Sequence, residues 1–477
     1  MSEKQPNLIY YVQRMAGHVA SIVRLESQNK TTARGGDILD IMFPIASVTN
    51  IRTFTVFGNA TTKASEAGGT ECGARMPPID DFIERVETTL GGDTLAQGAT
   101  FTNVLNSAKR GLGAATADSV LGHSEYCRKT QYIDGVELTG VTNEHYPSGA
   151  FSHFAMTKFP GYLETAEPPI QDLGVLPSLK VKLFLAPNSI LTTSAGVGLG
   201  NKPGGTAVSP AGFPADFTVA NGTDARYLLT DIFATVEVHT MMDQGYDMML
   251  ANQMANAGHL EISYKNYISF QEKHSGSTRW SVASQSIDRL WVMWRDETYN
   301  DMGAPIIVNG HKTKGGYLKA DGTAGAADVD IGLSQYDSGI LGTHTEKYKS
   351  KYFNFKAPNK AMTVQAQING QFFPTFPANL GVLYGMTKNA LEDPKNRMDL
   401  SLDQYINNYC CQVFRFNLPG SEKRRLISGI DSRNSNVSGI INTTNLGISG
   451  DNLALNLFVE TTSTVRVGPN KSVQVIA

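Results

Sequence analysis

The sequence predicts an all-β protein built from two tandem antiparallel β-sandwiches, with helical insertions and an N-terminal helix. Apolar residues alternate with polar ones over many short runs, and turn residues separate these runs, since the 477 residues include 46 Gly and 20 Pro. The block 226–295 reads as strand, short helix and further strands, which is expected where one β-domain ends and a second begins. With 41% hydrophobic residues, a chain of this length can bury a core in each domain.

An amphipathic helix is predicted over residues 7–24, inside an N-terminal arm that we assign to 1–34. Its apolar positions recur at spacings of three and four, and its candidate contact residues are Leu8, Val12, Met15 and Val19. Two interpretations stay open. The helix attaches to a lipid membrane or an underlying protein layer, or it packs against its own domain or a neighbouring subunit.

The first β-domain is assigned to residues 35–240. Its last strand, 227–238, places Ile232, Ala234, Val236 and Val238 on one apolar face. A long excursion at 59–148 contains predicted helices at 78–90 and 101–112, and residues 192–213 form a Gly- and Pro-rich loop. The other predicted strands are 37–43, 52–57, 150–156 and 179–185.

A linker is assigned to 241–258 and a second β-domain to 259–477. The linker holds a predicted helix at 243–257, with Asp243 as N-cap and Gly258 as stop. Residues 279–295 are predicted as a strand pair or one bent strand, and 380–393 as a helix that Pro394 ends. The remaining predicted strands are 260–270, 352–355, 362–368, 409–418, 452–459, 464–467 and 472–476.

The two halves share an order of elements. Residues 154–161 and 413–420 each place an alternating strand before Pro-Gly, and each follows an excursion that contains a predicted helix. This order favours a duplicated domain.

Composition argues against several functional classes. A net charge of -3 leaves no excess of cations to neutralise a phosphate backbone, so we expect no direct nucleic-acid binding, sequence-specific or otherwise. The four cysteines, Cys72, Cys127, Cys410 and Cys411, lack zinc-knuckle or redox spacing. With no signal sequence and no run of 18 apolar residues, we expect reduced thiols and synthesis in a non-secretory compartment.

We predict no catalytic, cofactor or metal site. The glycines at 196–200 lack dinucleotide spacing, the turn at 468–472 lacks the glycine that a phosphate loop needs before Lys471, and no second pair completes a metal site with His123 and Cys127. Four carboxylates in or beside the central strands could suit glycoside hydrolysis, and the alternative is solvated faces or salt bridges with Lys265, Arg289 and Arg295. These carboxylates are Glu261, Glu272, Asp288 and Asp296.

The tryptophans gather in one segment. Trp280, Trp291 and Trp294 all lie within the second-domain strands at 279–295. Because strand spacing puts Trp280 and Trp294 on one parity among apolar neighbours, core or interface anchoring is favoured over sugar stacking.

Taken together, these elements resemble the double jelly-roll major capsid proteins of the adenovirus and tectivirus lineage, of the polinton-like virus or virophage type. The residues that carry the resemblance are 227–232, 258–267 and 281–291. It implies a non-enzymatic major capsid protein of an icosahedral double-stranded DNA virus, assembling as pseudo-hexagonal homotrimers that tile the shell. It also implies penton and minor capsid proteins as partners, with an internal lipid membrane as a further candidate, and location in the virion after synthesis in the host cytoplasm or nucleus.

Two other classes stay open. One is a carbohydrate-binding or carbohydrate-hydrolysing β-sandwich protein, and the other is a minor structural protein of a virion. The first requires convergent carboxylates or aromatics in a cleft.

Overall fold

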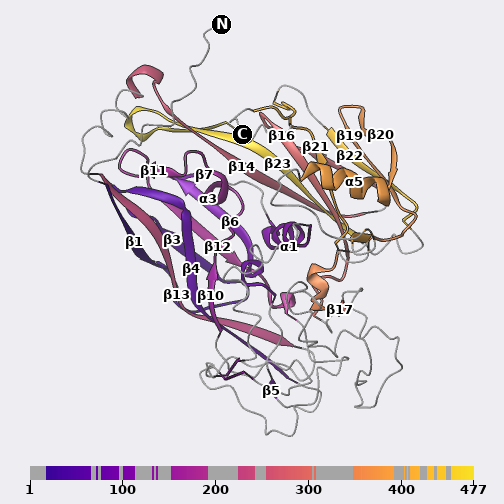
Figure 1. The fold of residues 1–477 in the computed structure, drawn as a ribbon, viewed down its shortest axis with the longest axis horizontal. Helices are drawn as coiled ribbons and strands as arrows, with labels where there is room; N and C mark the ends of the chain where they lie inside the picture. Colours follow the sequence, from indigo (N-terminus) through magenta and orange to yellow (C-terminus); the bar gives the residue numbers. More distant parts are fainter. Residues whose placement is uncertain are drawn as a thin grey trace, which may run out of the picture.

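A computed structural model gives the fold (Figure 1). It describes residues 18–65, 71–72, 77–95, 100–112, 132–133, 136–137, 152–191, 224–241, 254–274, 276–302, 306–307, 348–355, 357–391, 402, 405–406, 409–418, 427–433, 438–446 and 453–476. Antiparallel strands dominate these residues, which confirms the predicted all-β class.

The first roll pairs two sheets. One sheet has the order β1-β13-β4-β10 and the other β3-β12-β6-β7. Their strands are β1 (His18–Glu26), β3 (Ile38–Met42), β4 (Val48–Ser65), β6 (Ile83–Leu90), β7 (Asp93–Thr94), β10 (Ser152–Met156), β12 (Leu179–Leu185) and β13 (Ala225–Met241). Short strands β2 (Ala33–Arg34), β5 (Glu71–Cys72) and β11 (Ile170–Asp172) extend the first sheet, and the helices are η1 (Ile79–Phe82), α1 (Thr102–Leu112), α3 (Tyr162–Thr165) and η3 (Asn188–Ile190).

The second roll has sheets β14-β23-β16-β21 and β15-β22-β19-β20. Its strands are β14 (Leu260–Lys273), β15 (Ser277–Ser281), β16 (Ile287–Asp296), β19 (Thr363–Ile368), β20 (Gln371–Asn379), β21 (Cys411–Arg415), β22 (Ser438–Thr444), β23 (Leu453–Val467) and β24 (Val473–Ile476), the last paired with β23. Helices η4 (Lys351–Phe353), α5 (Leu380–Ala390) and η7 (Pro469–Lys471) complete it. Two further strand pairs are β8 (Tyr132–Ile133) with β9 (Val136–Glu137) and β17 (Ile306–Ile307) with β18 (Tyr348–Lys349).

Both rolls have the same topology. We number the eight main strands of each roll from 1 to 8 along the chain. In both rolls, neighbouring strands then have the order 1-8-3-6 in one sheet and 2-7-4-5 in the other. This is the strand order of a jelly roll. A helix of the same length precedes the sixth strand in each, α1 before β10 and α5 before β21. The Pro-Gly echo seen in the sequence follows these two equivalent strands, β10 and β21.

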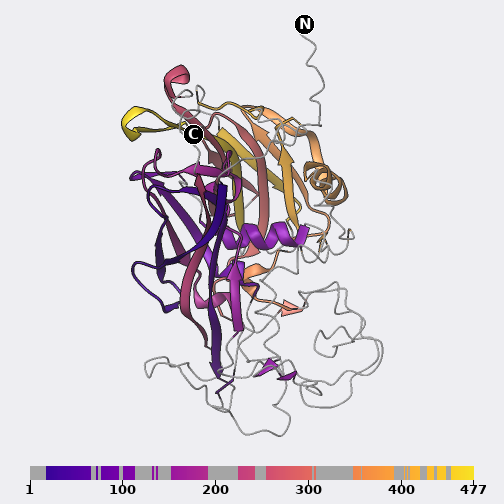
Figure 2. The same cartoon turned by 60° about the vertical axis from the view of Figure 1, so that its left-hand side comes forward.

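The rolls stand side by side with α1 between them (Figures 1 and 2). The long strands β14 and β23 run past the second roll and over one end of the first (Figure 1). Alternation holds where the sequence predicted it, since Ile232, Ala234, Val236 and Val238 are all buried in the core.

Several sequence-based expectations were wrong. Residues 18–26 form β1, hydrogen-bonded to β13, so Val19 lies in a strand and the sheet of the first roll begins within the predicted arm. The helix expected at 78–90 is η1 followed by strand β6, whose alternating residues face the core. Residues 352–355 begin in helix η4, and 279–295 contribute β15 and β16 to different sheets.

Other expectations lie wholly or partly outside the described residues. Leu8, Val12 and Met15 do so, as do the loop at 192–213, the pair His123 and Cys127, and most of the linker helix, of which residues 254–257 are helical. The helices predicted at 101–112 and 380–393 correspond to α1 and α5.

A buried histidine in the second roll should make stability pH-dependent. His274 is fully buried, its ring nitrogens contact Thr278 Oγ1 at 2.7 Å and Thr443 Oγ1 at 2.9 Å, and burial lowers its pKa to about 4. An unfolded histidine titrates near pH 6.5. As the pH falls from about 6.5 towards 4, only the unfolded chain gains this proton, so the free energy of unfolding should fall by about 3 kcal/mol.

Chemical denaturation of the wild type and of His274→Gln at pH 4, 5, 6 and 7 checks this. The variant should show a flatter dependence, because all other titrating groups are common to both proteins. Equal slopes would contradict the assignment.

Candidate functional site at the junction of the two rolls

Helix α1 is the element that the two rolls share. It belongs to the first roll, where Arg110 forms an ion pair with the buried Asp81 of η1 and Thr102 Oγ1 donates to the Ile83 carbonyl at 3.1 Å. Its other side meets the second roll so closely that a Cβ at Gly111 would lie 2.1 Å from Cδ1 of Tyr409. Only glycine leaves room for the Tyr409 ring at this position.

The outer face of sheet β14-β23-β16-β21 receives the helix. Lys109 of α1 donates to the Tyr267 hydroxyl at 2.8 Å, and its ammonium lies 4.3 Å from the Tyr267 ring centroid and 5.6 Å from that of Trp291. Cations over aromatic rings are attracted by the ring quadrupole, more strongly where water is excluded. The contact therefore combines packing with a positive charge on this sheet.

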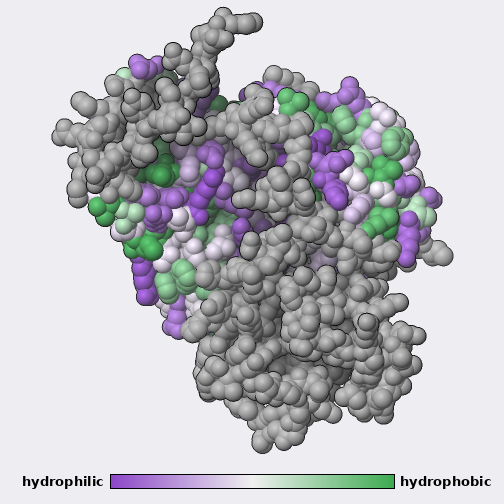
Figure 3. Space-filling model, viewed as in Figure 1, coloured by the Kyte–Doolittle hydropathy of each residue, from purple (hydrophilic) through white to green (hydrophobic). Residues whose placement is uncertain are grey.

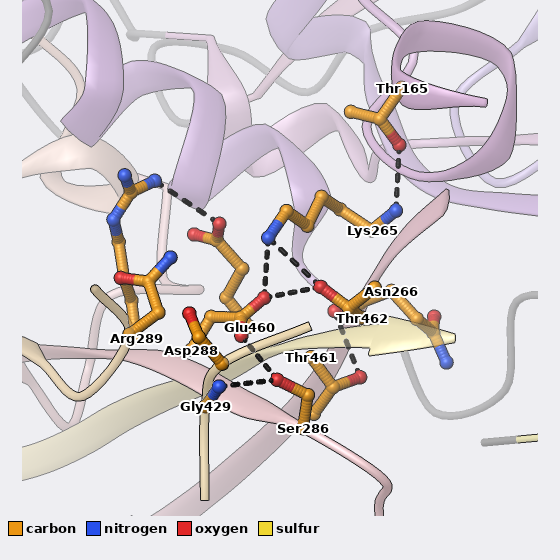
Figure 4. A network of polar contacts seen from close by, with 12 residues as sticks. Thr165, Lys265, Asn266, Ser286, Asp288, Arg289, Gly429, Glu460, Thr461 and Thr462 are labelled. Carbon is orange, nitrogen blue, oxygen red and sulfur yellow. Dashed lines mark hydrogen bonds and ion pairs between the residues drawn. The ribbon is translucent and has the colours of Figure 1, made fainter. Parts of the chain in front are cut away.

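Glu460 of β23 supplies the negative charge beneath Lys109. One carboxylate oxygen is 3.2 Å from Arg289 Nη1 (Figure 4), and the other accepts from Trp291 Nε1 at 2.9 Å. Burial alone would raise the pKa of Glu460, but Arg289, Lys265 and Lys109, with the Trp291 donor, hold it below its usual value. The carboxylate stays ionised in a fully enclosed position.

A second ion pair lies beside it (Figure 4). Lys265 contacts the buried Asp288, whose oxygens also accept from Thr462 Oγ1 at 2.5 Å and Ser286 Oγ at 2.6 Å. Ser286 Oγ accepts in turn from the Gly429 amide at 2.9 Å. Every oxygen of Asp288 has a partner, as a buried carboxylate requires.

Arg295 of β16 anchors another part of the junction. The residue is 1% exposed, and its guanidinium donates to the Tyr352 carbonyl at 3.1 Å and to Asn456 Oδ1 at 2.8 Å and lies 3.7 Å from the Tyr299 ring centroid. The ring centroid of Phe101, the residue just before α1, lies 5.3 Å from Cζ of the same guanidinium. Burial lowers the pKa of Arg295, and the surrounding tyrosines and Glu84 partly oppose this.

Backbone contacts join the rolls where β14 passes over the first roll. Glu167 and Ser263 form an antiparallel bridge with N–H···O distances of 2.8 and 3.2 Å. Lys265 N donates to Thr165 Oγ1 at 2.9 Å, and the Tyr264 hydroxyl donates to the Leu95 carbonyl at 2.7 Å. Backbone bonds fix register as well as proximity, so the rolls have one defined relative placement.

The three tryptophans lie in different surroundings. Trp280 and Trp294 are in the core of the second roll but on opposite sheets, Trp280 against Gly439 and Trp294 edge-on to His274. Trp291, of opposite parity in β16, faces α1 in the junction. Trp291 therefore contributes to the contact between rolls, whereas Val19 is half exposed near the start of edge strand β1.

The four carboxylates considered for hydrolysis do not converge. Glu261 and Glu272 lie near opposite ends of β14, about 35 Å apart at the rise of an extended strand. Asp288 is enclosed by Lys265, and Asp296 accepts from Thr298 in an exposed turn. The one enclosed member of the set, Asp288, has Lys265, Thr462 and Ser286 as partners, and none of these residues carries the second carboxyl group that a glycosidase needs.

Sequence reasoning did not identify the junction residues Lys109, Tyr267, Tyr409 and Glu460. One feature of the sequence did point to the junction. Trp291 and Trp294 are three residues apart in β16, so their side chains face opposite sides of the sheet and cannot both lie in the core of the roll. Within the described ranges, no group of three metal-ligating side chains is present and no helix is long and apolar enough to cross a membrane.

Two rolls of this order in one chain define the double jelly roll, the fold of viral major capsid proteins. The structure is similar to VP54 of PBCV-1, as fitted into a reconstruction of the virophage Sputnik, with a TM-score of 0.54, 11% identity, and coverage of 98% of this chain and 99% of that one. It is also similar to the Faustovirus major capsid protein, with a TM-score of 0.52, 10% identity, and coverage of 97% and 92%. A quasi-atomic model of the PBCV-1 capsid gives 0.51 at 11% identity over 98% and 99%. No protein-family model and no curated protein matches the sequence.

The close packing of α1 on the second roll can be tested with side chains of increasing size at Gly111. Gly111→Ala should lower the free energy of unfolding by about 1–3 kcal/mol, because a Cβ would overlap the Tyr409 ring, and Gly111→Val should lower it further. Denaturant titration measures both. Unchanged stability in the valine variant would show that the helix does not pack this closely.

The Lys265–Asp288 pair gives a second test. Lys265→Met should destabilise the protein by about 3–5 kcal/mol, because it leaves the buried Asp288 without its cation. Adding Asp288→Asn should recover part of this loss, since the amide is neutral. Arg433→Ala, which removes an exposed ion pair with Asp431, is the matched control and should leave stability unchanged. A double variant no more stable than Lys265→Met would argue against the assignment.

Proposed function

We propose that this chain is the major capsid protein of an icosahedral double-stranded DNA virus and that it assembles as a pseudo-hexagonal homotrimer. The observation that carries the proposal is the repetition of one jelly-roll topology twice in a single chain, joined through a buried junction. A trimer of such chains presents six similar rolls, so three subunits can occupy a six-coordinated position of a shell.

The junction supports a structural role rather than catalysis. Its ionised groups are paired and enclosed within the second roll, so they offer no free charge to a substrate. Contacts that cross between the rolls fix their relative position, namely Lys109 with Tyr267 and the Glu167–Ser263 backbone bridge. A tile in a closed lattice needs a fixed outline, because angular errors between rolls would accumulate across neighbouring contacts.

The proposal includes location in the virion after non-secretory synthesis in the host cytoplasm or nucleus. Its partners are further copies of the chain, and penton and minor capsid proteins at other lattice positions. Leu8, Val12, Met15 and Val19 are proposed to contact another chain, the base of a roll or an internal lipid membrane. The DNA would be contacted by other components, in keeping with the net charge of -3.

Mass photometry and negative-stain imaging of the purified chain test the trimer. We expect a particle of three times the 51.6 kDa chain mass at micromolar concentration, with a six-sided outline. A stable, folded monomer under these conditions would overturn the proposal.

A further inference from the structure

Each roll has an equivalent outer sheet face, and among the described residues only that of the second roll is covered by another part of the chain. In the second roll, the outer face of β14-β23-β16-β21 is buried beneath α1, so that Tyr267 is 4% exposed and Glu460 is 2% exposed. The equivalent sheet of the first roll, β1-β13-β4-β10, lies on the left of Figure 1, away from the second roll. Ile22 of its β1 is 77% exposed.

Residue register makes the equivalence specific. Glu460 of β23 pairs with Tyr267 of the first strand and with Arg289, the third residue of the third strand. Glu237 of β13 pairs with Ile22 of the first strand and with Asn50, again the third residue of the third strand. Each glutamate adjoins a register irregularity. Glu237 is thus the counterpart of Glu460, with its side chain 33% exposed.

The helices α1 and α5 also differ in how much of their surface is buried. In α1, the residues from Thr102 to Ala108 are all buried, because the second roll covers the side that the first roll leaves free. Its counterpart α5 packs on its own roll through Leu380, Leu383, Thr387 and Ala390 and leaves a side that includes Val382 and Lys388 exposed. Lys388 lies in the last turn of α5, as Lys109 does in α1.

The exposed side of α5 adjoins an apolar edge strand. In β20, Phe372 is 43% exposed and Phe376 is 51% exposed, and Val382 at the start of α5 is 37% exposed. Figure 3 shows hydrophobic residues among polar ones on the right-hand side of the molecule, where Figure 1 places β20 and α5. Adjacent exposed apolar side chains of this size are typical of a protein interface.

We propose that α5 and β20 of one chain cover the outer face of β1-β13-β4-β10 of a second copy, with Lys388 placed over Glu237 as Lys109 is placed over Glu460. The inference rests on the proposed trimer and names its contact surfaces. Within the chain, a helix of the first roll covers a sheet face of the second roll. The sheet face of the first roll and one side of helix α5 of the second roll are left uncovered by the described residues, at opposite ends of the chain's two-roll unit. Such a head-to-tail contact, repeated between chains, closes into a ring when the rotation permits.

A charge exchange tests the pairing. Lys388→Glu and Glu237→Lys should each raise the concentration at which trimers dissociate at least tenfold, because each places like charges together. The double variant should return this concentration towards the wild-type value. Ile22→Asp should also weaken the trimer, and Lys471→Glu, at the exposed β23–β24 hairpin, is the matched control without effect.

Mass photometry over a dilution series gives the trimer fraction, and thermal unfolding checks that each chain stays folded. A wild-type trimer that all three single variants leave intact would overturn these surfaces while the proposed function stands. A double variant no better than the single ones would overturn the Lys388–Glu237 pairing. A wild-type protein that remains monomeric would overturn both proposals.

Discussion

The contact of α1 with the second roll is the constraint on which the arrangement depends. Gly111 lets the helix approach the Tyr409 ring, and Lys109 lies over a sheet face where Glu460 remains ionised. Buried ion pairs add little net stability compared with apolar packing, but an unpaired partner is costly. The junction therefore penalises relative displacement of the rolls, because a slip would break the Lys109–Tyr267 contact and take one of three cations away from the buried Glu460.

Much of the fold could be predicted from the sequence because single strands carry their own pattern. The alternation in β13 predicted which residues are buried, and the Pro-Gly echo after β10 and β21 marked equivalent strands before either sheet was known. Residues 18–24 were predicted as the end of a helix because apolar side chains at spacings of three and four can also occur in an edge strand that has one face exposed. Pairing with β13, more than 200 residues away, decides their conformation.

The junction was predicted only in part. Salt bridges with Lys265, Arg289 and Arg295 were one interpretation of the carboxylates, and Lys265 does pair with Asp288, but the sequence did not indicate that Glu460 is enclosed and paired with Arg289. Asp288 is enclosed by Lys265, Thr462 and Ser286 of its own roll, whereas Glu460 also has Lys109 of the first roll nearby. Trp291 was expected to anchor packing, and it lies buried in the junction, where its indole N–H also binds Glu460.

Edge strand β20 includes Pro374 and Pro377, neither of which has a backbone N–H to donate. An exposed strand edge is ordinarily a template on which another chain can add strands without limit. At these two positions a foreign strand would find no donor, so continuous pairing along this edge is interrupted. The chain is thereby less prone to grow into fibrils at this edge, and association through side-chain surfaces, which can stop at a finite particle, is favoured.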